Sequence, residues 1–144
     1  MASNFTYKRS IAINAPLIKV WRILTDPASI KKIYFDMDWK TDWKKGSPII
    51  FSGDYDHQYF EDKGNILDIE KEKFILFNYY NPDSGKKDIP ENYTVMRFEL
   101  EANKNETIFT VFQYGFANEQ AFETVTTKWN FVLLTAKEMA EKLI

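Results

Sequence analysis

The residues that could do acid–base or metal chemistry gather in one short segment, Asp54-Tyr55-Asp56-His57. His57 is the only histidine of the chain, and histidine is the side chain whose unperturbed pKa lies near neutral pH. Because the segment ends a predicted strand, we interpret His57 as a solvent-exposed turn residue rather than a catalytic base. Adjacent strand residues point to opposite faces and seldom converge on one ion. We therefore expect no catalytic residue and no metal ion.

Hydroxyl and amide groups are more plentiful, and a few of them inside an apolar pocket would orient a bound molecule. The alternative for each is a hydrogen bond to the backbone or to water. The candidates are Tyr55, Tyr59, Tyr79, Tyr93, Tyr114, Asn78 and Gln113. Arg97 shares its strand parity with Glu99 and Glu101, which predicts a surface ion pair of little energetic consequence.

Composition excludes several functional classes. The 144 residues carry 19 basic and 21 acidic side chains, so the basic excess typical of nucleic-acid-binding proteins is absent. The absence of cysteine excludes disulfides, thiolate catalysis and cysteine-based zinc sites. The first residues do not form a signal peptide, and no apolar stretch approaches the roughly 18 residues that span a bilayer. These features predict a soluble cytoplasmic protein with one domain over residues 1–144.

Two helical patterns follow a first strand that alternates polar and apolar residues over 5–13. Asn14 or Ala15 is expected to cap the first helix, with Pro16 in its first turn. Asp26-Pro27 then starts a second, shorter helix. The apolar faces of these helices are expected to consist of Leu17, Val20, Trp21, Leu24, Ile30 and Ile33.

The helical period disappears between residues 36 and 115, where strands alternate with short turns. Gly64 is expected to form a bulge, and residues 81–92 form a loop. Successive strands joined by short turns predict an antiparallel meander. The predicted strands cover 39–43, 49–55, 59–69, 74–80, 93–101 and 107–114.

A long amphipathic helix is predicted at the end of the chain, with Asn118 as its N-cap. A helix of this length is stable because its apolar side lies on a sheet. Its apolar stripe comprises Phe122, Val125, Trp129, Val132 or Leu133, Ala136, Met139 or Ala140, and Leu143.

The order strand–helix–helix–strands–long helix resembles the α+β helix-grip fold of the START and birch-pollen-allergen superfamily. In this fold a curved antiparallel sheet of six to seven strands and a long C-terminal helix enclose a hydrophobic cavity. Several segments resemble the family named for homologues of the activator of the heat-shock protein 90 ATPase. They are residues 14–16, 20–27, 64–69, 95–100, 107–111 and 114–116, together with Trp129.

The resemblance implies a cavity between the concave sheet face and the last helix, without a cofactor. Gln113 stands where many relatives carry histidine, and an amide cannot exchange protons near neutral pH. The implied cavity residues are Phe51, Ile75, Phe77, Tyr79, Met96, Phe98, Phe109, Val111, Gln113, Trp129 and Leu133. The chain also contains 12 Phe, 8 Tyr and 4 Trp, which either line such a cavity or fill it.

Three functions remain open from the sequence. The first is binding of a hydrophobic or amphipathic small molecule, such as a lipid, a polyketide-like compound or an aromatic compound. The second is a cyclase- or dehydrase-type enzyme that uses the same cavity, with a tyrosine or Glu61 at a perturbed pKa. The third is a protein-interaction module related to chaperone regulation, which rests on fold-level analogy.

An outward apolar row on a late strand suggests a surface for a partner. This row consists of Ile108, Phe112 and Tyr114, and Phe131 similarly points away from Trp129 around the last helix. A homodimer through these faces is the corresponding hypothesis.

Overall fold

The computed structural model describes residues 5–142, which form one antiparallel sheet and three α-helices. The N-terminal elements are β1 (Tyr7–Ile13), α1 (Leu17–Thr25) and α2 (Pro27–Ile33). The central strands are β2 (Asp38–Lys40), β3 (Pro48–Tyr55), β4 (Gln58–Glu70) and β5 (Phe74–Tyr79). After two 3-10 turns, Pro82–Ser84 and Pro90–Asn92, come β6 (Thr94–Asn103), β7 (Glu106–Tyr114) and α3 (Glu119–Lys142).

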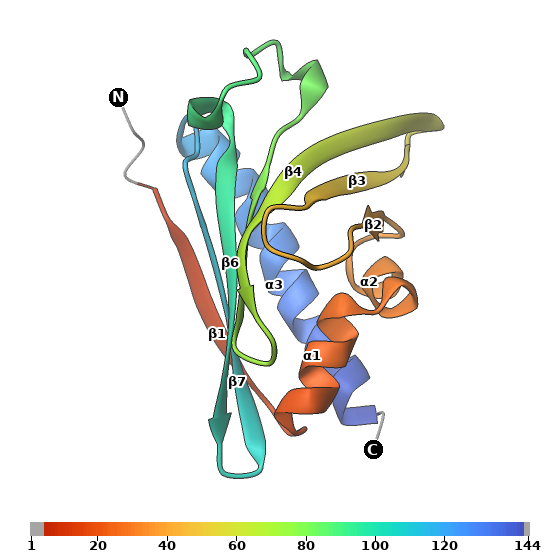
Figure 1. The fold of residues 1–144 in the computed structure, drawn as a ribbon, viewed down its shortest axis with the longest axis vertical. Helices are drawn as coiled ribbons and strands as arrows, with labels where there is room; N and C mark the ends of the chain where they lie inside the picture. The colour runs from red at the N-terminus through yellow and green to blue at the C-terminus, as the bar shows by residue number, and fades with distance from the viewer. Residues whose placement is uncertain (1–4, 143–144) are drawn as a thin grey trace.

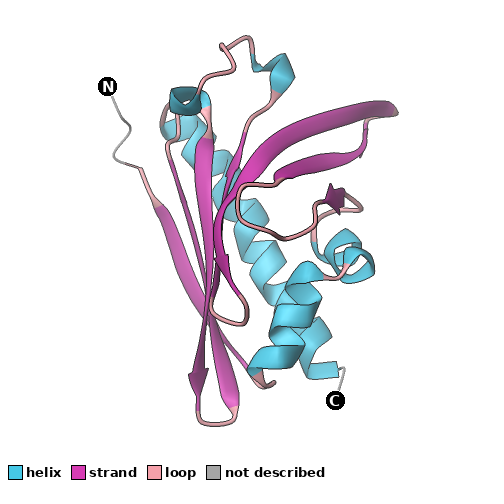
Figure 2. Cartoon of the chain, viewed as in Figure 1, coloured by secondary structure: helices cyan, strands magenta, loops and turns pink. Residues whose placement is uncertain are grey.

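The seven strands are ordered β1-β7-β6-β5-β4-β3-β2, and every neighbouring pair is antiparallel. The strands from β2 to β7 therefore form the predicted meander, and β1 closes the order by pairing with β7 (Figure 2). The register places Phe98 of β6 opposite Val111 of β7, so both side chains lie on the same, buried face.

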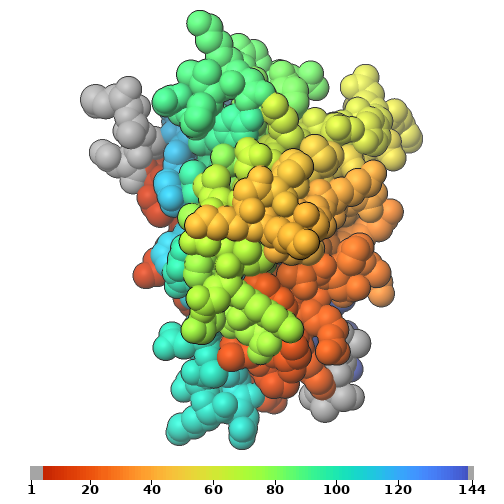
Figure 3. Space-filling model, in the orientation of Figure 1, coloured from red at the N-terminus to blue at the C-terminus, as the bar shows by residue number. Residues whose placement is uncertain are grey.

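The long helix α3 runs along the bend of the sheet, and α1 lies beside its C-terminal half (Figure 1). The buried residues of α3 are spaced at helical intervals and face the sheet, as the sequence predicts. They are Trp129, Val132, Leu133, Ala136 and Ala140. The predicted stripe residue Leu143 lies outside the described residues. The arrangement is the helix-grip fold, and residues of β3, β4 and α1 cover the face shown in Figure 3.

The predicted helix start at Asp26-Pro27 and the predicted N-cap at Asn118 are confirmed. The Asp26 carboxylate accepts hydrogen bonds from the backbone N–H and the hydroxyl of Ser29, and Asn118 Oδ1 accepts from the N–H of Ala121. The cap of α1 was predicted wrongly. Neither Asn14 nor Ala15 caps it, and Pro16 is itself the N-cap instead of a first-turn residue. The reason is that Pro16 is still extended, and its carbonyl oxygen accepts the N–H of Val20 at 3.3 Å.

The second predicted strand is shorter than expected. It ends at Lys40 instead of residue 43, and Trp43 has a φ of 58°, which no extended strand residue adopts. The predicted bulge at Gly64 is also misplaced, because the register between β4 and β5 shifts between Ile66 and Asp68. Gly64 has a different role: a Cβ atom there would lie 1.8 Å from the carbonyl oxygen of Asn78.

Among residues 5–142, none of the helices combines the length and the apolar character that crossing a bilayer requires.

We predict that Gly64→Ala destabilises the protein by about 3 kcal/mol or more, because a backbone atom cannot yield to the new methyl group. Chemical denaturation would measure the loss. Gly53→Ala is the matched control, since its Cβ would meet only side-chain atoms, the Phe60 ring at 3.2 Å and Met37 Cγ at 3.6 Å. A Gly64→Ala protein as stable as the control would contradict the close approach of Asn78.

Candidate ligand-binding pocket

A pocket of about 200 Å³ lies between the sheet, α3 and the segment that joins α2 to β2. Its lining is mostly apolar, with a few polar groups. Five of the eleven cavity residues expected from the sequence line it: Phe51, Tyr79, Met96, Gln113 and Trp129.

The other six expected residues lie in the packed core beside the pocket, where almost none of their surface is exposed. The ring centroid of Phe98 lies 5.2 Å from that of Phe77, 5.5 Å from that of Phe109 and 5.7 Å from that of Trp129, each with edge-to-face geometry. Aromatic rings thus fill much of the space that the resemblance implied as cavity. The six residues are Ile75, Phe77, Phe98, Phe109, Val111 and Leu133.

The segment between α2 and β2 supplies pocket residues that sequence reasoning missed. Phe35 and Asp36 have φ angles of 54° and 64°, and this left-handed turn brings Tyr34 and Trp39 into contact. Left-handed conformation is uncommon for a non-glycine residue, so the sequence carried no turn signal here. The only signal in the sequence that could have indicated this wall of the pocket is the high density of aromatic residues in the segment. The missed lining residues are Tyr34, Phe35, Met37, Trp39, Val125, Lys128 and Val132.

The buried amide of Gln113 joins three elements at the pocket. Trp129 Nε1 of α3 donates to Gln113 Oε1 at 2.6 Å, and Gln113 Nε2 of β7 donates to Thr94 Oγ1 of β6 at 3.2 Å. Both ends of the amide are therefore engaged within the protein. Gln113 holds the helix against the sheet, and it has no proton to give to a reaction at neutral pH.

A buried carboxyl group, Asp62, lies next to the pocket and was also missed. Asp62 lies on the same inner face of β4 as Ile66, so the alternation of inward and outward residues along the strand could have identified it. Only 5 % of its surface is exposed. The hydroxyl of Tyr79 donates to Asp62 Oδ2. Burial raises the pKa of Asp62, this hydrogen bond partly opposes the rise, and the charge of Asp83 adds to it. Burial and the Asp62 carboxylate together raise the pKa of Tyr79, so its hydroxyl stays protonated.

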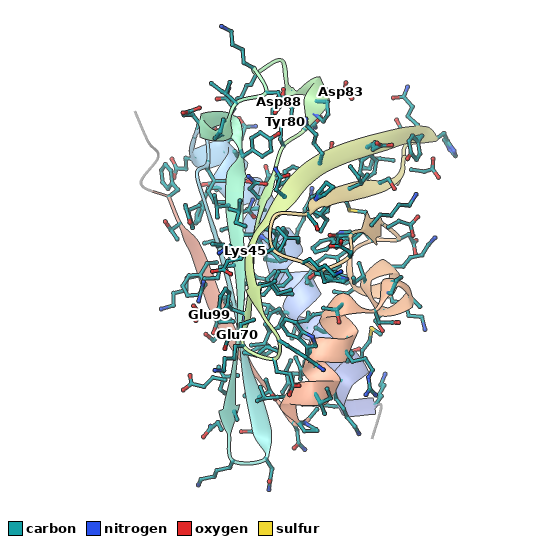
Figure 4. All side chains as sticks on the ribbon, in the orientation of Figure 1. Lys45, Glu70, Tyr80, Asp83, Asp88 and Glu99 are labelled. Carbon is teal, nitrogen blue, oxygen red and sulfur yellow. The ribbon has the colours of Figure 1, made fainter. Side chains whose placement is uncertain are left out.

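The loop of residues 81–92 is fastened to the sheet near this carboxyl group. Tyr80, Asp83 and Asp88 lie together at one end of the molecule (Figure 4). The hydroxyl of Tyr80 donates to the carbonyl oxygen of Lys86, and Lys63 of β4 forms an ion pair with Asp88. These contacts hold the middle of the loop, at Lys86 and Asp88, against Tyr80 and β4.

The remaining polar candidates lie away from the pocket. His57 is exposed in a left-handed turn, with a φ of 64°. Arg97 pairs with Glu99 on the outer sheet face, as predicted. Among residues 5–142 no group of three or more histidine or acidic side chains could hold a metal ion. Tyr55, Tyr59 and Tyr114 are exposed, whereas Asn78 and Tyr93 are half-buried and bonded to Asn65 and Asp88.

Comparisons with known proteins agree with this architecture. The family model described as activator of Hsp90 ATPase homolog 1-like protein matches residues 14–139. A protein of known solution structure from Cytophaga hutchinsonii is 32 % identical with a TM-score of 0.83, and the alignment covers 99 % of this chain and 97 % of that one. None of the curated protein sequences matches the chain.

Two more distant structures share the fold. The Aha1 protein from Colwellia psychrerythraea, whose solution structure is a dimer, is 21 % identical with a TM-score of 0.73, covering 95 % of this chain and 96 % of that one. CalU16 from Micromonospora echinospora is 19 % identical with a TM-score of 0.74, covering 93 % of this chain and 73 % of that one.

The raised pKa of Asp62 predicts a pH-dependent effect of Asp62→Asn. A raised folded-state pKa means that the native protein prefers the protonated carboxyl. Its stabilising contribution is complete below the ordinary value of 3.8 and is lost as the pH rises through the folded-state pKa. Asparagine keeps the acceptor for Tyr79 without the charge, so the variant should melt about 2–5 °C above the wild type at pH 7.

Thermal denaturation between pH 3 and pH 7 would test this, and the difference should vanish at the acidic end. Glu61→Gln, on the exposed face of the same strand, is the control and should show no such pH-dependent gain. A pH-independent effect of Asp62→Asn would contradict the assignment.

Proposed function

The chain belongs to the family of activator of Hsp90 ATPase homolog 1-like proteins, and on that basis we propose that it binds a small hydrophobic or amphipathic molecule in the pocket between the sheet and α3. The observation that carries the proposal is an apolar pocket with a few fixed polar groups, in a core that is otherwise filled by aromatic rings. Binding would remove the apolar surface of the ligand from water, and the polar groups would set its orientation.

The size of the pocket narrows the ligand class. About 200 Å³ is below the roughly 300–1,000 Å³ of pockets for drug-sized ligands and above the roughly 150 Å³ in which an apolar cavity binds benzene. Of the lipid, polyketide-like and aromatic ligands considered from the sequence, a compact aromatic molecule of about 8 to 10 non-hydrogen atoms fits best.

A cyclase- or dehydrase-type enzyme is the second candidate, and the hydrogen bond between Tyr79 and Asp62 favours it. A carboxyl group with a raised pKa beside a pocket is a recognised acid–base element. The variant Asp62→Asn separates the two functions, because it would abolish turnover of a polyketide-type substrate but leave binding intact.

We predict that filling the pocket abolishes binding without unfolding the protein. Met96 lines the pocket from β6, so the indole of Met96→Trp would occupy the ligand's space. Isopropylbenzene is a suitable probe, with an expected Kd on the order of 0.1–1 mM in the wild type, and Met96→Trp should weaken it at least about 10-fold.

Val95→Trp is the matched control, because Val95 precedes Met96 on β6 and its side chain points to the opposite face of the sheet. Native mass spectrometry of freshly purified wild type, before and after organic extraction, would show in addition whether a natural ligand co-purifies. Equal probe affinity in wild type and Met96→Trp would contradict the pocket as the binding site.

We further propose a second copy of the chain as a protein partner. The rings of Phe35 and Phe131 stack on the surface with centroids 5.2 Å apart, and Leu134 beside them on α3 is also exposed. On the outer sheet face, Ile108 and Phe112 are only half-exposed, so the helix side offers the more exposed apolar surface. The dimer of the Colwellia relative supports self-association within this fold.

Size-exclusion chromatography with light scattering should give twice the chain mass of 17.0 kDa, and Phe131→Ser should restore the single mass. Tyr114→Ser, on the alternative face, is the control and should remain dimeric. A wild-type mass of 17.0 kDa at high protein concentration would remove the proposal.

A further inference from the structure

The lining of the pocket changes from buried to exposed residues in one direction. Phe51, Met96 and Gln113 are at most 5 % exposed, so they form the floor of the pocket. Phe35, in the segment between α2 and β2, and Lys128 of α3 are exposed, so they mark its mouth. The pocket therefore has a largely apolar floor inside the protein and an opening between this segment and α3.

The polar groups near the floor are engaged within the protein. The Gln113 amide is bonded at both ends, to Trp129 and to Thr94, and the hydroxyl of Tyr79 donates to Asp62. These groups are already paired, so a ligand gains little from them. The floor therefore selects a ligand by its shape and apolar surface.

Two further donors in the wall do not contact a ligand. The Tyr34 hydroxyl and the Trp39 indole N–H have no partner among residues 5–142, but packed protein covers both atoms. A molecule in the pocket therefore meets the rings of these residues and not their polar atoms.

Lys128 carries the polar group of the lining that is both accessible and unpaired. Its ammonium group forms no ion pair or hydrogen bond with residues 5–142. The residues one helical turn away on α3 carry no acid that could pair with it; they are Thr124, Val125, Phe131 and Val132. Of the described lining residues, Lys128 is the one cation, and none is acidic. An unpaired positive charge thus lies at the mouth of an apolar pocket.

The acidic groups nearby restrict where a ligand can carry a charge. Asp38 lies in the segment beside the mouth, does not line the pocket, and pairs with Lys31 at 3.7 Å. The buried carboxyl group of Asp62 lies behind Tyr79. An anionic group on the floor would lose its hydration near Asp62, which is unfavourable. The charged end of a ligand therefore belongs at the mouth.

We propose that the ligand is a compact aromatic acid, whose ring fills the floor of the pocket and whose carboxylate lies at the mouth beside the ammonium group of Lys128. The inference rests on the proposed function and names the ligand class for the same pocket. A lysine side chain carries its charge at the end of an apolar stem, so Lys128 can contact both parts of such a molecule. The carboxylate stays hydrated at the mouth, so binding avoids the cost of burying a charge.

Three probes that share a benzyl group test the proposal: phenylacetate, phenylacetamide and 2-phenylethylammonium. Their head groups are negative, neutral and positive at pH 7, and the first two have equal numbers of non-hydrogen atoms. In a titration followed by amide NMR shifts, phenylacetate should bind about 3- to 5-fold more tightly than phenylacetamide, as one exposed ion pair allows. The ammonium probe should bind more weakly than both. Salt at about 1 M should remove the preference for phenylacetate.

The variant Lys128→Met removes the charge and keeps an apolar stem of similar length. It should lower phenylacetate affinity about 3- to 5-fold and leave phenylacetamide affinity unchanged, whereas Lys128→Arg should keep the preference. Lys142→Met is the matched control, because Lys142 is an exposed lysine near the other end of the same helix, and it should change neither affinity. All three variants should melt near the wild-type temperature, because they change exposed side chains.

The outcomes separate this inference from the function on which it rests. Equal binding of phenylacetate and phenylacetamide, tighter binding of the ammonium probe, or binding of isopropylbenzene alone would keep the pocket as a binding site and overturn the aromatic acid. A preference for phenylacetate that persists in Lys128→Met would assign the carboxylate to another group, which also overturns the proposal. Failure of all three probes and of isopropylbenzene to bind the folded wild type would overturn both proposals.

Discussion

The hydrogen bond between the Trp129 indole and the Gln113 amide is the contact on which the architecture around the pocket depends. It crosses from α3 to β7 inside an apolar interior, where an unpaired indole N–H or amide would be costly. The second end of the same amide reaches Thr94 on β6, so the helix is held at one depth above two strands. A purely apolar contact would let the helix slide, because dispersion has little directionality.

The aromatic core decides how much space remains once the helix is in place. Phe77, Phe98 and Phe109 pack edge to face beneath Trp129 and fill the deep part of the sheet's bend. A pocket remains between the sheet, α3 and the turn next to Tyr34 and Trp39. The interior of the protein is thus neither hollow nor completely filled. Aromatic residues fill the core in one region and line the pocket in another.

The polar groups around the pocket divide into those that the fold satisfies and those that it leaves unpaired. Gln113 and Tyr79 are fully committed to partners within the chain, and they hold the elements in position. The Tyr34 hydroxyl and the Trp39 indole N–H are buried donors without acceptors among the described residues. His57, which attracts attention in the sequence, lies elsewhere, exposed on the surface.

The sequence by itself determined the order of elements, the antiparallel meander, the start of α2 at Asp26-Pro27, the N-cap at Asn118 and the inward direction of Trp129. Periodicity and cap chemistry are local properties, so they can be read from neighbouring residues. Only the tertiary structure decided which inward residues line a pocket and which are covered by other rings. Periodicity shows which side of a helix or strand faces the interior, but not how deeply each residue is buried there. The tertiary structure also decided the left-handed turn at Phe35 and Asp36 and the close approach at Gly64, since distant elements impose both conformations.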